Sequence, residues 1–562
     1  MKKNTLIRAA SALIVALSAS VAAQGTQFLS PARAAGNASP MAGIVVNTTA
    51  DEDTANASCS LREAIIASNI NAAYKGCTAG QAAPLPDSIV IDSGVNSITL
   101  GPTPLPAITG GYVVLMTEDA PGLGLPDRTA LSGGNLSVGD DLLTIASSRV
   151  VVTGMMFVNV PESGSGMKVT AGSSIVIAGN TFGVGALLAA CQTELDSVGI
   201  YIESAVDDGG GANPSVHIFS NTIGCMGRYG VLIEGADDVL VGDEDSAAAP
   251  NWIGTASSGF ALPNKSGVGV GRGAQNNRIL NNVVAGNAEH GILLRGRGAA
   301  ATPDTRDNVI AGNRIGVLRS GIALPNGNDG VILLEGATLN TIGGASEDER
   351  NVISANGLSG VNLVHGDANS VLGNYIGTDI HGTAVLTGQI DGVRIQAGSG
   401  NVIGCTQACP GATKGNLIGG NSTGVRVIGG VAHKIIGNQI GFRLVLTAEN
   451  IPLGNSMAGI DVGGAATGLQ IGDPDTALRG NFVGYNSTGI RLAGSGVKGS
   501  ILVDNVLLRN SDAGLLITAD VSGTRVGSAT AKNTLSQNGA GIIVSDGATG
   551  TRIENAVVRE SA

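Results

Sequence analysis

Aromatic residues are scarce in this chain, and their scarcity restricts how its core can be built. They make up 2% of the 562 residues, whereas hydrophobic residues of all kinds make up 43%. The core must therefore be filled by valine, isoleucine, leucine and alanine, which suits a narrow column of small coils. Glycine is abundant, with 87 residues, but it lacks the collagen period and therefore indicates turns rather than a fibre.

The chain also lacks a basic patch, a second long apolar run and a helical crossover pattern. Its formal net charge is −12 and its pI is about 4.9, which argues against nucleic acid as a partner. No apolar stretch after residue 23 is long enough for a membrane-spanning helix. Nothing between the short apolar segments has the length and 3.6-residue period of a crossover helix.

The sequence contains one short repeat that recurs many times, and each copy carries a characteristic glycine and asparagine, here called the glycine mark and the asparagine mark. Each glycine mark precedes an apolar residue and then alternating residues, and each asparagine mark stands two residues before an apolar residue. A period of about two dozen residues or more indicates stacked supersecondary units. The glycine marks are Gly166, Gly199, Gly230, Gly267, Gly291, Gly330, Gly360, Gly392, Gly424, Gly459, Gly489, Gly514 and Gly541. The asparagine marks are Asn180, Asn221, Asn251, Asn313, Asn351, Asn374, Asn416, Asn438 and Asn481.

The repeating unit is built of β-strands. Its apolar segments are short, rich in valine and isoleucine, alternate with polar residues, and are bounded by Gly and Asn. Coils of this kind predict an all-β, single-stranded parallel β-helix, a solenoid. We expect Gly and Asn at the bends because they adopt left-handed backbone conformations easily. We also expect the recurring Asn to stack as a structural ladder of side-chain amides.

The N-terminus is typical of an export signal. Lys2, Lys3 and Arg8 precede an apolar stretch over residues 9–23 that is short for a membrane span. Cleavage is expected near residues 22–23 or 34, so we predict a secreted or surface-displayed protein. The expected divisions are a signal and lead over residues 1–35, an N-terminal cap with the first strands over 36–135, and β-helix repeats over 136–562.

Six cysteines agree with export, because an even number in an exported chain suggests disulfides. Sequence proximity favours the pairs Cys59–Cys77, Cys191–Cys225 and Cys405–Cys409. The alternative for the last pair is half of a zinc site, although no second Cys or His pair stands nearby.

A capping helix is expected after Cys59. Ser60 followed by Glu63 forms the sequence signature of a capping box at a helix start. Leu61, Ala64, Ile65 and Ser68 would then share one apolar face, which suits a helix that closes the N-terminal end of a β-helix.

The same segment resembles a known family. The stretch TTADEDTANASCSLREAIIASN, followed by DSIVID, SITL and LPAIT, is similar to exported bacterial proteins named for their Cys-Ser-Leu-Arg-Glu-Ala motif. The later phrases NVISANGLSGV and GNYIGTDIHGT resemble the repeats of that family. The resemblance implies a right-handed parallel β-helix outside the cytoplasm. Members are mostly of uncharacterised activity, so it implies no catalytic residues.

No catalytic constellation is evident. Parallel β-helices also include pectin-degrading lyases and hydrolases, and glycoside hydrolysis needs two carboxylates on one face. No acidic pair recurs at matching places in neighbouring repeats. His290 is interpreted as a residue at the start of a strand, and Arg394 and Arg491 as outward-facing residues without an acidic nest. We therefore expect no catalytic, cofactor-binding or metal-binding residues.

Three acidic loops recur after strands. We interpret them as a solvated rim. Calcium binding by their carboxylates is the alternative, although the spacing lacks the regularity of a calcium-binding repeat. The loops are Gly242 to Ser246, Ser346 to Arg350 and Gly472 to Thr476.

The distance from each asparagine mark to the next glycine mark alternates between eight or nine residues and 16 to 21 residues, if Asn282 is counted with the marks. If each interval is the same turn of successive coils, the long loops project from one flank at every second coil. Folding of the leucines of GFALPN and GIALPN back onto the coil is the structural alternative. The residues placed to contact an extended ligand are Trp252, Arg314, Tyr375, Asp379, His381 and Arg443.

These observations predict a binding or structural module, adhesin-like or glycan-contacting, with an extracellular polysaccharide or a cell-surface component as its partner. The alternative function is a polysaccharide lyase or glycoside hydrolase acting on an acidic polysaccharide.

Overall fold

The protein is described by a computed structural model that divides it into two compact units. Unit 1 comprises residues 1–221 and 236–240, and unit 2 comprises residues 222–235 and 241–562. The expected signal and lead lie outside the described residues. The described residues are 43–81, 85–118, 128–184, 191, 195–203, 214–244, 250–297, 304–405, 415–445, 449–473 and 480–561.

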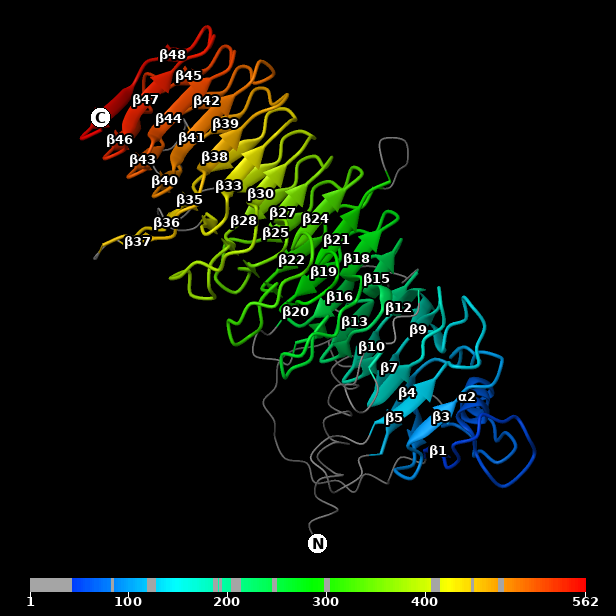
Figure 1. Ribbon diagram of the computed structural model, residues 1–562. Coiled ribbons are helices and arrows are strands. Elements are labelled where there is room, and N and C mark those ends of the chain that lie inside the picture. The colour runs from blue at the N-terminus through cyan, green and yellow to red at the C-terminus, as the bar shows by residue number, and fades with distance from the viewer. Residues whose placement is uncertain are drawn as a thin grey trace, which may run out of the picture. The chain divides into compact units, whose positions relative to one another are not determined.

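In both units, short strands follow one another around a coil and pair in parallel with the strands of neighbouring coils (Figure 1). The strands fall into three parallel sheets, here called sheets 1, 2 and 3 in the order in which each coil visits them. One helix, α2 (Leu61–Ile70), lies in the described part of the chain. The prediction of an all-β parallel β-helix with a short helix is confirmed.

Unit 1 holds the first coils, and parallel pairing already begins between β1 and β2. Its sheet 1 strands are β1 (Ile44–Val46), β2 (Asp87–Ile91), β4 (Val113–Thr117), β7 (Val150–Thr153), β10 (Ile175–Ala178) and β13 (Val216–Phe219). Its sheet 2 strands are β3 (Ser97–Thr99), β5 (Thr129–Ser132), β8 (Met155–Val158) and β11 (Thr181–Phe182). Its sheet 3 strands are β6 (Leu143–Ala146), β9 (Ser165–Ala171) and β12 (Leu195–Ile202).

Unit 2 holds the remaining coils, and the first two residues of its strand β16 belong to unit 1. In sheet 1 the strands are β16 (Val239–Gly242), β19 (Arg278–Leu280), β22 (Val309–Ala311), β25 (Thr341–Gly343), β28 (Ser370–Leu372), β31 (Val402–Gly404), β34 (Lys434–Ile436), β39 (Gln470–Ile471), β42 (Ile501–Leu502), β45 (Arg525–Val526) and β48 (Arg552–Ile553). In sheet 2 they are β14 (Thr222–Ile223), β17 (Trp252–Ile253), β20 (Val283–Val284), β23 (Arg314–Ile315), β26 (Val352–Ile353), β29 (Tyr375–Ile376), β32 (Leu417–Ile418), β35 (Gln439–Ile440), β40 (Phe482–Gly484), β43 (Val506–Leu508), β46 (Asn533–Ser536) and β49 (Ala556–Arg559). In sheet 3 they are β15 (Gly227–Glu234), β18 (Ser266–Gly271), β21 (Ile292–Arg295), β24 (Val331–Leu334), β27 (Ser359–Leu363), β30 (Asp391–Ile395), β33 (Thr423–Val427), β38 (Ala458–Val462), β41 (Thr488–Ala493), β44 (Ala513–Thr518) and β47 (Ala540–Val544). A small antiparallel pair, β36 (Phe442–Arg443) and β37 (Ile451–Pro452), stands apart from these sheets.

Alternation along each strand separates an aliphatic interior from an outward row. In the coil of β26 and β27, Ile353, Val361 and Leu363 point inward and are fully buried. From β14 to β43 the second residue of each sheet 2 strand is likewise buried, because side chains alternate between the two faces of a strand. The first residue of each of these strands therefore faces outward, and this row forms the candidate site.

The asparagine marks form a hydrogen-bonded ladder at the corner between sheets 1 and 2, as predicted. The Nδ2 of Asn313 donates to Oδ1 of Asn351 at 3.1 Å and to the carbonyl oxygen of Ile279 at 2.7 Å. Its Oδ1 accepts from the backbone N–H and the Nδ2 of Asn282. The hydrogen bonds of each amide thus pair its own buried nitrogen and oxygen and also pair buried backbone groups at the bend. The described members in unit 2 are Asn251, Asn282, Asn313, Asn351, Asn374, Asn416, Asn438, Asn481, Asn505 and Asn533.

Two further ladders stand at the other corners of unit 2, and the sequence analysis did not foresee them. Between sheets 2 and 3, amides bond in the order Asn264, Asn287, Asn326, Asn356, Gln389, Asn421, Asn455, Asn486, Asn510 and Asn538. Between sheets 3 and 1, the order is Asn277, Asn308, Asn340, Asn369, Asn401 and finally the ring of His433.

The physical reason given for the glycine marks was wrong. In unit 2 these glycines do not have the left-handed φ expected of a bend. A Cβ on Gly360 would instead lie 2.7 Å from both the carbonyl oxygen of Gly392 and a methyl group of Ile376. The left-handed residues at the first corner stand one position before the ladder asparagines, as at Gly312 and Gly373. Glycine is therefore required at these positions because neighbouring coils pack too closely to leave room for a side chain.

The N-terminal cap agrees with its prediction. Ser60 and Glu63 form a capping box, in which the Ser60 hydroxyl accepts from the Glu63 N–H and the Glu63 carboxylate accepts from the Ser60 N–H. Leu61, Ala64, Ile65 and Ser68 are all buried on one face of α2. Figure 1 shows α2 beside β1, among the first elements of unit 1.

The cysteines are oxidised wherever the structure describes them. Cys59 and Cys77 form the predicted disulfide, which ties the start of α2 to the segment that follows it. Cys191, Cys225 and Cys405 are each disulfide-bonded. The partners of these three cysteines are not established, and Cys409 lies outside the described residues. The pairings Cys191–Cys225 and Cys405–Cys409 therefore stay predictions.

Candidate functional site

The outward row of sheet 2 in unit 2 brings three of the expected contact residues into one register. Trp252 pairs with Val283, and Val283 pairs with Arg314. The row continues through Val352 to Tyr375, and then through Leu417 to Gln439. Large or charged residues thus alternate with small aliphatic ones along the first part of the row. Neighbouring strands lie about 4.8 Å apart, so residues two strands apart are separated by about 10 Å.

The long loops align along one edge of this row. Each joins a strand of sheet 2 to the following strand of sheet 3, and each contains an antiparallel bridge that folds it into a hairpin. The predicted alignment on one flank is confirmed for these four loops, while most of the fifth, after Asn180, lies outside the described residues. The bridges are Thr255–Ala261, Val317–Ala323, Thr378–Val385 and the β36–β37 pair.

Three of the hairpins, the first, second and fourth, rest on the coils that precede them. Leu262 and Leu453 are buried, and their carbonyl oxygens accept from Cys225 and Gly420 in neighbouring coils. Leu318 and Leu324 pack in one cluster with Val283 and Trp252. The hairpins therefore align on one flank, and their leucines also fold back onto the coils. Trp252 is a half-buried residue that packs against these leucines, so its ring is not free to bind a ligand.

The other edge of sheet 2 is bordered by the longer connections from sheet 1. The loop between β25 and β26 contains the acidic segment Ser346 to Arg350, and Gly312 of the preceding coil donates its N–H to the carbonyl oxygen of Glu349 at 3.1 Å. Hydrogen bonds from the backbone and hydroxyl of Ser346 hold the pKa of the Glu349 carboxyl below its usual value. The Glu349 carboxylate thus closes this loop, and residues 345–349 are all exposed, as expected of a solvated acidic rim.

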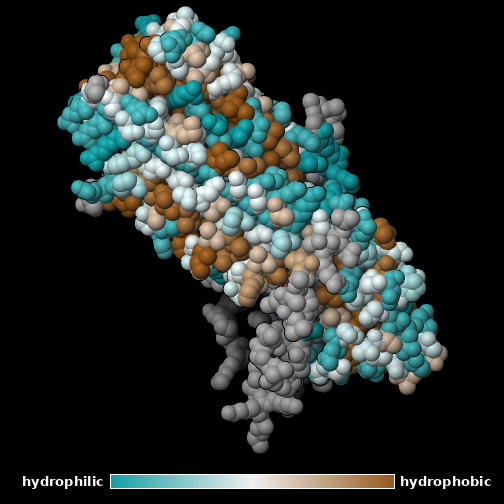
Figure 2. All heavy atoms as spheres, viewed as in Figure 1, coloured by the Kyte–Doolittle hydropathy of each residue, from teal (hydrophilic) through white to brown (hydrophobic). Residues whose placement is uncertain are grey.

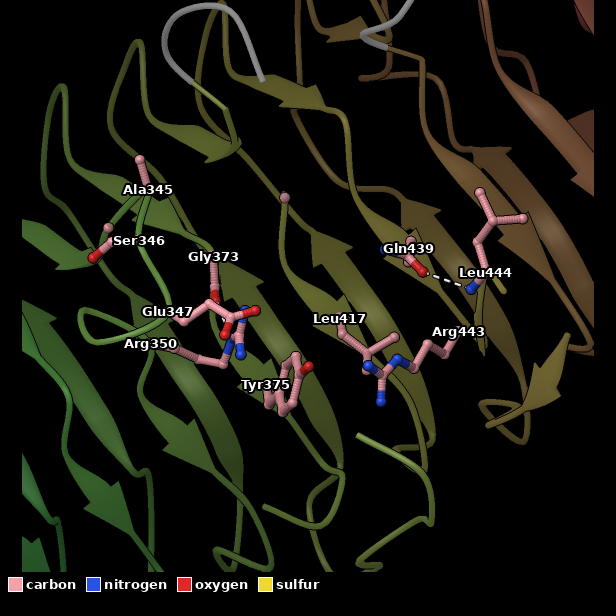
Figure 3. Close-up of a pocket in the computed structure, with 12 residues that line it drawn as sticks. Ala345, Ser346, Glu347, Arg350, Gly373, Tyr375, Leu417, Gln439, Arg443 and Leu444 are labelled. Atoms are coloured by element: carbon pink, nitrogen blue, oxygen red, sulfur yellow. Dashed lines mark hydrogen bonds and ion pairs between the residues drawn. The ribbon is translucent and has the colours of Figure 1, made fainter. Parts of the chain in front are cut away.

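A pocket with a volume of about 210 Å³ opens over sheet 2 between this loop and the fourth hairpin. Figure 3 shows Tyr375 and Leu417 on the strands between the two, with Arg350 approaching from the loop and Arg443 from the hairpin. Tyr375 and Arg443, two of the expected contact residues, meet here although 68 positions separate them (443 − 375). The lining residues are Gly344, Ala345, Ser346, Glu347, Arg350, Gly373, Tyr375, Gly415, Leu417, Gln439, Arg443 and Leu444.

The charges of the pocket are held in place by neighbouring groups. The Arg350 guanidinium lies 4.3 Å from the ring centroid of Tyr375, and its Nε donates to the carbonyl oxygen of Gly373 at 3.3 Å. Glu347 lies 3.8 Å from Arg350, but its side chain is 87% exposed and its attraction is weakened by water. Arg443 donates to the carbonyl oxygen of His381 on the third hairpin at 2.5 Å. The lining therefore carries one net positive charge in a protein of net charge −12.

Arg314 stands two strands from Tyr375 on the same row. It is half-buried between Val283 and Val352, both of which are buried. Within the described residues its guanidinium has no hydrogen-bond or ion-pair partner. Burial lowers the pKa of Arg314, and the nearby charge of Arg319 lowers it further.

Two of the expected contact residues have structural tasks. The Asp379 carboxylate accepts from the backbone N–H groups of Thr383 and Ala384 and from the Thr383 hydroxyl, which closes the third hairpin. Burial alone would raise the pKa of Asp379, but these hydrogen bonds lower it. His381 is exposed, and its backbone carbonyl, which accepts from Arg443, is its contribution to the pocket.

Sheet 3 carries a second row of charges on its outward face, and here the sequence interpretation was wrong. Arg394 and Arg491 do have acidic partners: Arg394 lies 3.6 Å from Asp391, and Arg491 lies 2.9 Å from Asp461. Arg426 stands between them, 3.8 Å from Asp391 and 3.3 Å from Asp461. Asp461 and Arg491 lie on neighbouring strands of successive coils, whereas Asp391 and Arg394 lie three positions apart on β30.

His290, further along the same face, is a positioned structural residue. It stands just before β21, as expected, and its Nδ1 accepts from the N–H of Asp329 at 3.3 Å. Burial lowers the pKa of His290, although Asp329 and Glu289 act in the opposite direction. Asp329 in turn accepts from Asn362 and from the N–H of Ser359.

No group of three or more His, Cys, Asp or Glu side chains comes together as metal ligands in the described part of the chain. Parts of the acidic loops after β16 and β39 lie outside it, so the solvated rim stays the prediction there and calcium binding its alternative. No helix among the described residues is long and apolar enough to cross a membrane.

The face of the molecule drawn in Figure 2 is mixed in character. Hydrophobic and hydrophilic residues alternate in small patches on the face drawn in Figure 2. The exposed apolar side chains on the hairpins are Phe260, Ile322 and Val385.

No family model matches the chain, and no curated protein matches its sequence. Solved structures of similar fold include the A-module of the Azotobacter vinelandii mannuronan C-5 epimerase AlgE4, at 14% identity and a TM-score of 0.41 over 69% of this chain and 86% of that one. The Dettilon tailspike protein is 15% identical over 73% of this chain and 60% of that one, with a TM-score of 0.36. The periplasmic alginate epimerase AlgG is 13% identical over 84% and 77%, with a TM-score of 0.30. At these values the likeness is one of fold and carries no argument about activity.

Proposed function

We propose that this protein is an exported, secreted or surface-displayed binding module that holds an acidic polysaccharide against the outward face of sheet 2. The observation that carries the proposal is the pocket in which Arg350 and Arg443 flank Tyr375. An aromatic ring with flanking guanidinium groups offers a flat apolar surface and charge-assisted hydrogen bonds to carboxylates. A sugar that bears a carboxylate presents both complementary surfaces.

Export is supported by the N-terminal pattern, by the resemblance of the segment after Cys59 to the Cys-Ser-Leu-Arg-Glu-Ala family and by the oxidised cysteines. Disulfides form and persist in oxidising compartments. A rigid stack with one bordered face suits an adhesin-like protein that contacts a glycan at a cell surface or in its surroundings.

Binding without cleavage is favoured over hydrolysis. Among the described lining residues Glu347 is the single carboxylate, whereas glycoside hydrolysis uses two. Glu347 is also solvated and turned toward Arg350. The lyase or hydrolase alternative therefore has less support from this pocket than simple retention of the polymer.

The test is affinity for a panel of purified polysaccharides, with polygalacturonate and alginate as acidic members and dextran and mannan as neutral ones. We expect micromolar to millimolar binding of acidic members only, and a loss of about tenfold for Tyr375→Ala or Arg443→Ala, since 1.4 kcal/mol corresponds to a factor of ten. Arg509→Ala is the matched control, because Arg509 lies against the ring of Tyr485 away from the pocket lining.

Equal binding of neutral polymers, no binding of any polymer, or equal losses in the pocket and control variants would contradict the proposal. Release of reducing or unsaturated ends from the acidic polymers would instead favour the hydrolase or the lyase.

A further inference from the structure

The outward row of sheet 2 contains a second cation that the pocket does not use. Arg314 lies on β23, and Tyr375 lies on β29, with β26 between them. The two positions are therefore about 10 Å apart along the stack. Both are first residues of sheet 2 strands and face the same side.

The setting of Arg314 is unusual for a structural arginine. It stands between two buried valines and has no counter-charge or hydrogen-bond acceptor within the described residues. A charge taken partly out of water without a partner is costly, so partly buried arginines normally occur in ion pairs. A carboxylate supplied by a ligand would remove this cost, and a guanidinium fork matches its geometry.

Arg314 lies between the loops that border the two edges of sheet 2. The loop that carries Arg350 is hydrogen-bonded to Gly312, just before Arg314 in the chain. On the other side, the second hairpin begins after Ile315 and carries Arg319. Arg314 is therefore bordered by the loop that also borders the pocket, and on its other side by the second hairpin, whereas the pocket is bordered there by the fourth.

We propose that Arg314 is a second carboxylate subsite and that the ligand is a linear polyuronate lying along the stack, across the strands of sheet 2. This inference rests on the proposed function and adds the direction and minimum extent of the ligand. One acidic group occupies the Tyr375 pocket and another, roughly two strands away, reaches Arg314. A single sugar acid or a small anion fills one position only.

The test is the dependence of affinity on chain length, measured by calorimetry with oligogalacturonates from the monomer to the hexamer. We expect the wild-type affinity to rise about tenfold or more once the oligomer spans both positions. Arg314→Ala removes this rise and leaves the affinity for the shortest bound oligomer unchanged. Arg314→Lys, which keeps the charge, restores part of it, and Arg319→Ala serves as a neighbouring control.

The outcomes separate the two proposals. If Arg314→Ala keeps the full length dependence with an unchanged thermal unfolding profile, the second subsite is refuted and the pocket stands. If short oligomers bind and length has no effect in the wild type, the linear path is refuted. If no oligomer binds at all, both proposals fail together.

Discussion

The faces of sheets 2 and 3 in unit 2 both carry arginines, but in opposite electrostatic settings. On sheet 3, Arg394, Arg426 and Arg491 are interleaved with two aspartates, Asp391 and Asp461. Over sheet 2, Arg314 on β23 and Arg443 on β36 of the fourth hairpin have no carboxylate within 4 Å among the described residues. The same residue type in the same fold thus occurs as a paired row on one face and as an unpaired row on another.

The difference assigns the two faces to different tasks. Paired charges across neighbouring coils neutralise each other and brace the stack, at a modest gain in free energy. Unpaired arginines against an apolar row contribute little to folding and retain their capacity for an external anion. Sheet 3 is thus a structural face, and sheet 2 is the face proposed to bind.

Removing both unpaired arginines should have the largest effect on binding. For Arg314→Ala/Arg443→Ala we expect the affinity for a long acidic oligomer to fall about 100-fold, because each charged contact contributes roughly 1.5 kcal/mol or more. Titration calorimetry measures it. The paired double variant Arg394→Ala/Arg491→Ala is the control, and an equal loss there would erase the distinction between the faces.

Removing a paired arginine should instead lower stability. Arg426 bridges two aspartates and is 27% exposed. We expect Arg426→Ala to reduce the free energy of unfolding by about 1–2 kcal/mol, below the cost of breaking a fully buried pair. Denaturant unfolding measures the change, with Arg525→Ala, which breaks an exposed pair with Glu554, as the control. A stability loss no larger than that of the control would show that the row does not brace the stack.

Removing an acidic partner should leave an arginine of sheet 3 without a carboxylate, as on sheet 2, and so allow it to bind an acidic polymer. Asp461→Ala leaves Arg491, which is 44% exposed, without its carboxylate. We expect a gain of about threefold in affinity for an acidic polymer, since an isolated exposed arginine adds less than one complete charged contact. An unchanged affinity at low salt would mean that an unpaired charge alone is insufficient.

The smallest effect concerns the pH dependence of stability. Burial raises the pKa of Asp391, although Arg426 and Arg394 act in the opposite direction. The native state therefore holds this proton more tightly than the unfolded chain, and the stability due to Asp391 is lost as the pH rises through its folded pKa. The difference in unfolding free energy between the wild type and Asp391→Asn should fall as the pH rises from about 4, the ordinary pKa of the group. A difference that rises over the same range would contradict the assigned direction.

Much of the fold is predictable from this sequence because its signals are local and repeated. The Val- and Ile-rich segments, the capping box at Ser60 and the asparagine marks each reflect a nearby hydrogen-bonding or packing requirement. The ladder between sheets 2 and 3 was missed because its asparagines stand in bends, as Asn287 and Asn356 do, where Asn needs no special explanation. An Asn, or Gln at position 389, recurs three or four residues before each glycine mark from Gly267 onward, and this is the signal that could have revealed the ladder.

The candidate site was predicted only in part, since it depends on contacts between coils. Tyr375 and Arg443 were singled out from the loop alternation. Arg350 was assigned to a solvated acidic rim, because its position against the Tyr375 ring follows from the stacking of two successive coils. The acidic partner of Arg491 was missed for the same reason, because strand register joins it to Asp461, 30 positions away. Asp391, the partner of Arg394, was overlooked although it stands only three positions before it on the same strand.

The central claim is that sheet 2, and not sheet 3, is the binding face. Hydrogen–deuterium exchange of the full chain, with and without a saturating acidic oligosaccharide, tests it directly. We expect added protection in the loop over residues 344–350 and in the hairpins over residues 316–324 and 377–386, with unchanged exchange in β30 and β33. Protection centred on β30 and β33, or no protection anywhere under saturating conditions, would contradict the account.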